Sequence, residues 1–302
     1  TQLLALDGAQ FDEGLCDLLG VPRSALATVV DTQGHLTDTT LLGGSIPIAG
    51  LAGDQQAATI GQGCFAPGET KATYGTGAFV LTNMGQSVPQ SANRLLGTVL
   101  MQDKGKRTYA LEGSVFVAGS LIQWLRDSLG MIASAAETDA LARSVPDSGG
   151  VTIVPALSGL GAPHWNAEAR GVVTGLSFAT GRAQLARAAL EAMAHQTHDL
   201  CAAFAADGAP WGRLRIDGGM SANDWMAQDL ADVLALEVER PDMVETTALG
   251  AGMLAAVGTG QFASLSDAAA SMRGAVRKFD PAMDDAVRDE RLFRWDKALR
   301  AV

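Results

Sequence analysis

A polar tetrad at a glycine turn, Gly53-Asp54-Gln55-Gln56, constrains this chain most, together with the glycine hairpin Tyr74-Gly75-Thr76-Gly77 that follows it. The tetrad offers one carboxylate and two amides after an apolar, glycine-rich stretch, and the hairpin offers a hydroxyl between glycines. A phosphoryl-transfer site needs a base for the attacking hydroxyl, polar groups that hold it, and backbone open to a phosphate. The two segments together therefore suggest such a site.

Each segment also has a purely structural interpretation. Asp54 follows a glycine and precedes a helical pattern, so it could simply cap that helix, which is the commoner role of such an aspartate. Two adjacent glutamines in an apolar neighbourhood weaken this interpretation, because a cap does not require them. The hairpin could be only a β-turn. It is not a Rossmann fingerprint, because its glycines lead into a strand pattern at residues 78–81 instead of a helix.

Composition excludes several classes of protein. The 302 residues are 47% hydrophobic and 18% charged, which indicates a globular chain, and the net charge of −11 disfavours a nucleic-acid partner. No apolar run reaches the ~18 residues that a membrane span requires, so we expect no integral membrane segment. Three widely spaced cysteines predict reduced thiols and a cytoplasmic location. The chain begins with Thr1 close to the tetrad, which suggests that a preceding part is missing.

The hydrophobic pattern predicts an α/β fold with a mixed sheet. Turn-separated strands are expected first, with a hairpin tip at Lys104-Gly105, and strands that alternate with helices are expected afterwards. We expect a short strand that runs into a tight turn within residues 41–53. We expect further strands at residues 70–74, 79–83, 97–101, 108–112, 151–154, 171–176 and 214–216. We expect helices at residues 11–19, 54–62, 115–129, 184–204, 222–234 and 246–257. The best domain division falls near residues 60–70.

Two further motifs leave alternatives open. The turn at residues 217–223 follows a strand and opens a helix, so Ser221 could be a helix cap. Equally, a ligand could approach the bare backbone there, at the carboxyl end of a strand. Glu191, His195 and His198 share one helix face and superficially resemble a metal site, but no second carboxylate–histidine pair completes it. We therefore expect a solvated helix face.

Taken together, these segments resemble the glycerol kinases, a branch of the FGGY carbohydrate kinase family. The resemblance covers nearly the whole chain and rests on independent motifs in the same order, at residues 48–58, 74–77, 110–113, 122–127 and 159–163. Residues 171–191 also fit the second signature of the family. The resemblance implies an actin-like ATPase (ribonuclease H-like) domain. It implies that residues 1–60 are the terminal remnant of a first, substrate-side domain and that residues 61–302 form the second, nucleotide-side domain.

The resemblance also implies roles for individual residues. Asp54 would be the catalytic base and would hold Mg²⁺ indirectly through water. Gln55 would bind substrate hydroxyls, and Phe79 would pack on the carbon face of the substrate. Thr76 would contact the nucleotide phosphates. The positions that line the nucleoside pocket would be Gly119, Gln123, Gly219 and Asn223.

The implied activity is the ATP-dependent phosphorylation of glycerol to glycerol 3-phosphate, with ATP and Mg²⁺ as cofactors. The implied partners are a small polyol and ATP, and the full-length protein is expected to be a homo-oligomer. The alternatives are another FGGY kinase such as a xylulokinase, or a non-catalytic nucleotide-binding fragment. The pair Gln55-Gln56 and Phe79 favour glycerol. The first domain of the family supplies further polyol-binding and phosphate-binding residues, so this chain alone is expected to be inactive.

Overall fold

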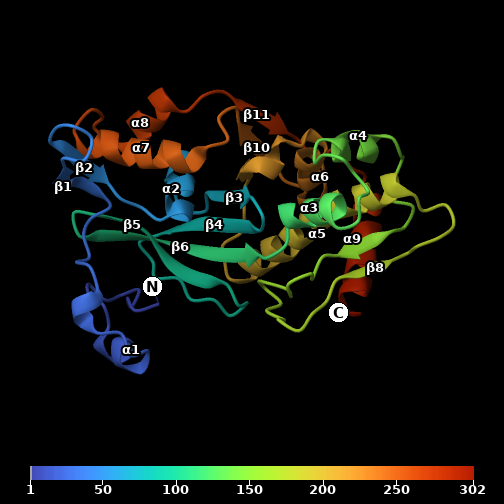
Figure 1. The fold of residues 1–302 in the computed structure, drawn as a ribbon, viewed down its shortest axis with the longest axis horizontal. Helices are drawn as coiled ribbons and strands as arrows, with labels where there is room; N and C mark the ends of the chain where they lie inside the picture. Colours follow the sequence, from blue (N-terminus) through green and yellow to red (C-terminus); the bar gives the residue numbers. More distant parts are fainter. Residues whose placement is uncertain (1) are drawn as a thin grey trace.

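A seven-stranded mixed sheet forms the centre of the molecule (Figure 1). The computed structural model describes residues 2–302. In spatial order the strands are β11 (Val276–Phe279), β10 (Val238–Pro241), β9 (Leu214–Asp217), β3 (Thr70–Tyr74), β4 (Ala78–Gly85), β6 (Lys106–Val115) and β5 (Leu96–Asp103). Strand β9 pairs in parallel with β3 and β10, and the other pairs in this sheet are antiparallel. The predicted mixed sheet is confirmed.

Short turns connect two of the antiparallel pairs, as the sequence predicted. The β3–β4 hairpin closes through residues 75–77, with Tyr74 opposite Ala78. The β5–β6 hairpin turns at Lys104 and Gly105, whose φ angles are +50° and +73°. Left-handed backbone at both positions gives the strands the twist that a two-residue hairpin requires. The hairpin tip predicted at these residues is therefore confirmed.

The main core lies between this sheet and a group of helices. These helices are α3 (Gly119–Asp127), α4 (Glu137–Arg143), α5 (Arg182–Ala206) and α6 (Asp224–Leu234). Gly113 of β6 lets α5 approach closely, because a Cβ atom there would lie 2.7 Å from Leu200 and 3.1 Å from Phe204. Helix α5 is long, but within residues 2–302 no helix combines the length and apolar character that crossing a membrane requires.

Two helices that are far apart in sequence cross at a pair of glycines. They are α2 (Asp54–Gly61) and α7 (Thr246–Gly258), which share a second, smaller core with α8 (Leu265–Met272). A Cβ atom on Gly61 would lie 2.0 Å from the Thr246 carbonyl oxygen, and one on Gly250 would lie 1.8 Å from the Ala57 carbonyl oxygen. The backbones of the two helices are therefore in direct contact, and this contact fixes the position of α2 relative to α7.

A small hairpin packs against the other end of α7. It consists of β1 (Gln33–Thr39) and β2 (Ile46–Gly50) in antiparallel pairing. A Cβ atom on Gly258 would lie 2.0 Å from the Ala49 carbonyl oxygen, so α7 and β2 also meet through bare backbone. The sequence pattern predicted β2 but missed β1, α4, β10, α8 and β11. The division at residue 60 stays a prediction.

The remaining elements are short, apart from the last helix. They are α1 (Glu13–Leu18), β7 (Thr152–Val154), β8 (Val172–Thr174), α9 (Asp285–Leu299) and the 3₁₀ turns η1 (Arg23–Ala25) and η2 (Gly219–Ala222). Strands β7 and β8 form their own antiparallel pair, and Trp295 of α9 packs against Val154 of β7. The C-terminal helix α9 therefore packs on residues of β7, which lies in the middle of the sequence.

The prediction of a solvated face on α5 is wrong for Glu191 and His195, whereas His198 is partly exposed. Glu191 and His195 are 4% and 3% exposed, because α9 covers this face. His195 stacks on Trp295 with ring centroids 5.3 Å apart, and Glu191 pairs with Arg187 at 3.1 Å. The helices α6 and α9 are joined nearby by Arg291 and Asp229, a buried bidentate pair at 2.5 and 2.9 Å. His195 therefore contributes to the packing of α5 against α9, and the Arg291–Asp229 pair joins α9 to α6.

His195 should make the stability of the protein depend on pH. Burial lowers its pKa well below the ordinary 6.5, and both ring nitrogens lack hydrogen-bond partners. The folded protein therefore keeps this ring neutral, whereas the unfolded chain takes up a proton below pH 6.5. Stability from this group is fully present above pH 6.5 and is lost as the pH falls, by about 1 kcal/mol between pH 6.5 and 5.5.

Urea unfolding of the wild type and of His195→Phe, which keeps a ring on Trp295, isolates this effect. The free energy of unfolding of the wild type minus that of the variant should fall by about 1 kcal/mol as the pH is lowered from 6.5 to 5.5. A difference that is independent of pH in this range would show that His195 takes up a proton as readily in the folded protein as in the unfolded chain.

Candidate functional site

Asp54 is the first residue of α2, and its carboxylate is exposed. Gly53 is the N-cap residue, so the interpretation of Asp54 as the cap is wrong. The Oδ1 atom of Asp54 accepts a hydrogen bond from the backbone N–H of Gln55 at 2.8 Å. Within residues 2–302, no hydrogen bond reaches its Oδ2 atom. This oxygen is available to a ligand at the open end of the helix.

A buried cation lies next to this helix start. Lys71 of β3 is fully buried, and its Nζ atom donates to Gln55 Oε1, to Thr73 Oγ1 at 2.9 Å and to the Phe79 carbonyl oxygen at 3.4 Å. Burial lowers the pKa of Lys71 to about 8, although nearby carboxylates, Asp217 first among them, oppose this shift. Sequence reasoning missed Lys71, because a single lysine in a strand carries no motif.

Two carboxylates, Asp217 and Glu112, lie close enough to Lys71 to influence it electrostatically. Asp217, at the end of β9, is buried and accepts hydrogen bonds from Gln62 Nε2 at 2.8 Å and Thr246 Oγ1 at 2.7 Å. It therefore ties the end of α2 to the start of α7. Burial raises the pKa of the Glu112 carboxyl on β6, and Lys71 and Ser114 partly offset that shift. Neither carboxylate was assigned a role from the sequence.

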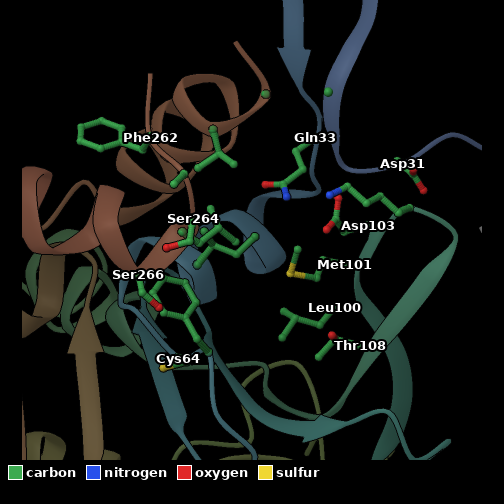
Figure 2. Close-up of a pocket in the computed structure, with 18 of the residues that line it drawn as sticks. Asp31, Gln33, Cys64, Leu100, Met101, Asp103, Thr108, Phe262, Ser264 and Ser266 are labelled. Carbon is green, nitrogen blue, oxygen red and sulfur yellow. The ribbon is translucent and has the colours of Figure 1, made fainter. Parts of the chain in front are cut away.

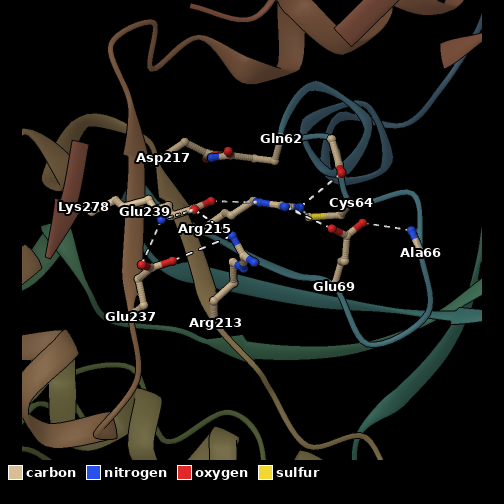
Figure 3. Close-up of polar contacts among 11 residues, drawn as sticks. Gln62, Cys64, Ala66, Glu69, Arg213, Arg215, Asp217, Glu237, Glu239 and Lys278 are labelled. Carbon is tan, nitrogen blue, oxygen red and sulfur yellow. Dashed lines mark hydrogen bonds and ion pairs between the residues drawn. The ribbon is translucent and has the colours of Figure 1, made fainter. Parts of the chain in front are cut away.

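An ion-pair network around Arg215 lies next to Asp217 and Gln62 (Figure 3). Arg215 of β9 pairs with Glu69 at 2.9 Å and with Glu239 of β10 at 3.2 Å, and it donates to the Cys64 sulfur at 3.4 Å. Burial raises the pKa of the Cys64 thiol to about 11, so this cysteine stays protonated and is not a nucleophile. The network joins the strands on which Lys71 and Asp217 lie.

Three glycine segments meet at the carboxyl ends of β3 and β9. The hairpin around Thr76 lies against the start of α3, where a Cβ atom on Gly119 would lie 2.5 Å from the Gly75 carbonyl oxygen. Gly218, which follows β9 with φ +84°, also lies against β3, because a Cβ atom on it would lie 2.6 Å from the Tyr74 carbonyl oxygen. The structure thus brings Thr76, Gly119 and the 218–219 turn together, although they are distant in sequence.

The hydroxyl of Thr76 is a free polar group of this hairpin within residues 2–302. The Thr76 carbonyl accepts from Ala118 N, Ser120 N and Ser120 Oγ at 2.9–3.1 Å. The first N–H groups of α3 are therefore already occupied by the hairpin and are not open to a phosphate. The Thr76 side chain is exposed, and Oγ1 makes no hydrogen bond within residues 2–302.

A cavity of about 420 Å³ opens beside the 218–219 turn. Gly219 and Asn223 line it, and sequence reasoning missed its other walls, which are Ala135, Ala136, Asp139, Met220, Ala222 and Asp224. Asn223 caps α6 by accepting from Met226 N at 2.9 Å, and it donates to Thr138 at 3.1 Å. The predicted cap at Ser221 is therefore wrong. The cavity has the size of a small-ligand site.

The predicted residues fall into two groups. Asp54, Gln55 and Phe79 gather around Lys71, and Thr76, Gly119, Gly219 and Asn223 gather around the glycine segments and the 420 Å³ cavity. Gln123 lies on α3, one turn after Gly119, and is exposed. It does not line this cavity.

A larger cavity, of about 740 Å³, lies elsewhere (Figure 2). Its walls come from β1, the β5–β6 hairpin and the α7–α8 connection, with Leu100, Met101 and Phe262 on its apolar side. None of the predicted site residues lines it. Size alone therefore does not locate the candidate site. Across residues 2–302, no three histidine, cysteine, aspartate or glutamate side chains form a group that could hold a metal ion.

The comparisons with known proteins concern the family and the fold of the chain. Residues 70–259 match the family model "FGGY family of carbohydrate kinases, C-terminal domain". The chain is 51% identical over 302 residues to a glycerol kinase of Aromatoleum aromaticum, covering 99% of this chain and 61% of that protein. It is 51% identical to a glycerol kinase of Rhodospirillum centenum, covering 99% of this chain and 60% of that protein.

Solved structures show the same fold. The crystal structure of Plasmodium falciparum glycerol kinase with ADP superposes with a TM-score of 0.91 at 33% identity, covering 99% of this chain and 61% of that one. A xylulose kinase from Rhodospirillum rubrum gives a TM-score of 0.79 at 28% identity, covering 96% of this chain and 60% of that one. The chain spans about three fifths of the length of the curated relatives it matches.

Proposed function

The chain belongs to the FGGY family of carbohydrate kinases, and on this premise we propose that it carries the catalytic base and nucleotide pocket of an ATP-dependent glycerol kinase. The arrangement at the start of α2 carries the proposal. An exposed carboxylate oxygen of Asp54 lies beside Gln55, whose amide nitrogen has no partner within residues 2–302. A hydroxyl bound there meets both a proton acceptor and a hydrogen-bond donor. Relatives at about 50% identity are named glycerol kinases, which supports glycerol as the acceptor.

We place the nucleotide at the glycine segments. The 420 Å³ cavity at Gly219 and Asn223 has room for a nucleoside, and the free Thr76 hydroxyl lies at the hairpin that adjoins the same turn. The similar Plasmodium enzyme was crystallised with ADP, which supports an adenine nucleotide here. Gly119 contributes by its missing side chain, because any Cβ there would push α3 away from the hairpin.

The proposed reaction is an in-line phosphoryl transfer. Asp54 accepts the proton of the substrate hydroxyl, the hydroxyl oxygen bonds to the γ-phosphorus, and the bond from this phosphorus to the β–γ bridging oxygen breaks to release ADP. Because the transition state is loose, alignment and electrostatic stabilisation matter more than the strength of the base. Gln55 would hold a hydroxyl and Phe79 would pack on the carbon chain, so both supply alignment.

At this site Mg²⁺ would be held through bound water molecules and not by a set of direct protein ligands. The described residues offer no cluster of three ligands, and Asp54 Oδ2 is free to bind a water of the ion. When bound to the phosphates, Mg²⁺ neutralises their charge. The two-domain division at residue 60, the homo-oligomer and the cytoplasmic location are further parts of this proposal.

An acceptor panel tests the proposed function in the full-length protein that carries these residues. With ATP and Mg²⁺, we expect kcat/KM for glycerol to exceed that for xylulose and dihydroxyacetone by at least about tenfold. A preference for xylulose would assign the chain to another branch of the family. No phosphorylation of any polyol or ketose would indicate a protein that only binds nucleotide.

A further inference from the structure

One buried side chain connects two of the three residues that we assign to the acceptor substrate. The Lys71 ammonium donates to Gln55 Oε1 and to the Phe79 carbonyl oxygen, and Thr73 Oγ1 takes its third bond at 2.9 Å. An ammonium has three donors, and all three are used. No carboxylate lies within ion-pair distance of Lys71 in residues 2–302, so the direct partners of the charge are neutral oxygens.

This bond decides how the Gln55 amide is oriented. A lysine ammonium can only donate, so the Gln55 atom that contacts it must be the carbonyl oxygen and not the nitrogen. The Nε2 group of Gln55 then points away from Lys71, with both N–H groups free of partners in the described residues. A glutamine without this anchor could turn its oxygen outward equally well.

We propose that Lys71 is a positioning residue that fixes Gln55 as a hydrogen-bond donor to the acceptor substrate. The inference rests on the proposed function and extends it to the kind of group that the site selects. A hydroxyl that accepts from Gln55 keeps its own proton, which it can donate to Asp54. The site therefore favours a neutral polyol oxygen. It disfavours an ammonium group at this position, because such a group has no lone pair to accept the bond.

The alternative is that Lys71 only stabilises the fold. The carboxylates that influence it electrostatically are Asp217, Glu112 and Asp54, and a cation among them would help to hold the sheet together. These two roles differ in what they predict for the substrates. A positioning role acts on the polyol through Gln55, whereas a purely structural role would affect polyol and nucleotide alike.

A double-mutant cycle in the full-length protein separates the two roles. Lys71→Met should raise KM for glycerol at least about tenfold, because a charge-assisted hydrogen bond is lost, and should leave KM for ATP within about twofold. Gln55→Ala should have a similar effect. In the double variant, KM for glycerol should rise no further than in Gln55→Ala alone. Lys106→Met, at an exposed lysine of the β5–β6 hairpin, is the matched control.

Each other outcome has a defined meaning. Additive effects of the two substitutions, or equal rises in both KM values, would overturn the positioning role while the proposed function stands. A wild type that phosphorylates no polyol would overturn the proposed function, and this inference with it. If Lys71→Met does not fold, Thr73→Val removes only one anchor and should give a smaller rise, about threefold, that is confined to glycerol. No such selective rise would overturn the inference.

Discussion

Asp54→Asn in the full-length protein should lower turnover with glycerol and ATP by ~10²-fold or more. The substitution keeps the size and the local hydrogen bond to Gln55 N but removes the basic oxygen that would accept the hydroxyl proton. Because Asp54 lies at the start of α2, away from the cavity at Gly219 and Asn223, nucleotide binding should stay within about twofold of the wild type.

Steady-state kinetics and calorimetry with ATP check the two halves of this prediction. Asp289→Asn is a matched control, because this exposed aspartate of α9 lies outside the proposed site. Turnover of Asp54→Asn close to that of the wild type would remove Asp54 from its role as base. A large loss of ATP binding in the same variant would mean that Asp54 serves the nucleotide or its metal ion instead.

Gly250→Ala should destabilise the protein by about 3 kcal/mol, although alanine normally stabilises a helix relative to glycine. The new Cβ atom would lie 1.8 Å from the Ala57 carbonyl oxygen and 2.8 Å from Gly61 N, so α2 and α7 must move apart. Because Asp54 is the first residue of α2, we expect turnover to fall as well.

Gly252→Ala on the same helix is the control for this prediction. A Cβ atom there meets only the end of Met272 at 3.5 Å, an ordinary contact, so this variant should be stabilised by up to ~1 kcal/mol. Urea unfolding of the two variants measures the difference. Equal stabilities would show that the helix crossing can relax and that the glycine contact does not set the position of α2.

The sequence predicted those parts of the fold that depend on local signals. Turn glycines and alternating hydrophobic residues located β3 to β6, and helical spacing located α5 and α7. The hairpin tip at Lys104 and Gly105 followed from its residue types alone. Strands β10 and β11 were missed, because what defines them is a pairing across the intervening helices α7 and α8. Strand β1 was missed because its polar sequence shows no alternation of hydrophobic residues, although it pairs with the nearby β2.

The site shows the same division between local and long-range information. Asp54, Gln55 and Thr76 lie in recognisable motifs, so they could be proposed before the structure was seen. Lys71 could not, because its importance comes from bonds to Gln55 on α2 and Phe79 on β4. His195 was misjudged for the same reason: its cover, Trp295, comes from a helix about 100 residues later.

The central claim is that the start of α2 binds the acceptor and that the cavity beside α6 binds the nucleotide. A crystal structure of the full-length protein with glycerol and a non-hydrolysable ATP analogue tests this claim directly. We expect a glycerol hydroxyl within hydrogen-bond distance of Asp54 Oδ2, Gln55 Nε2 donating to glycerol, and the base in the cavity lined by Gly219 and Asn223. A nucleotide bound elsewhere, or glycerol remote from Asp54, would contradict the claim.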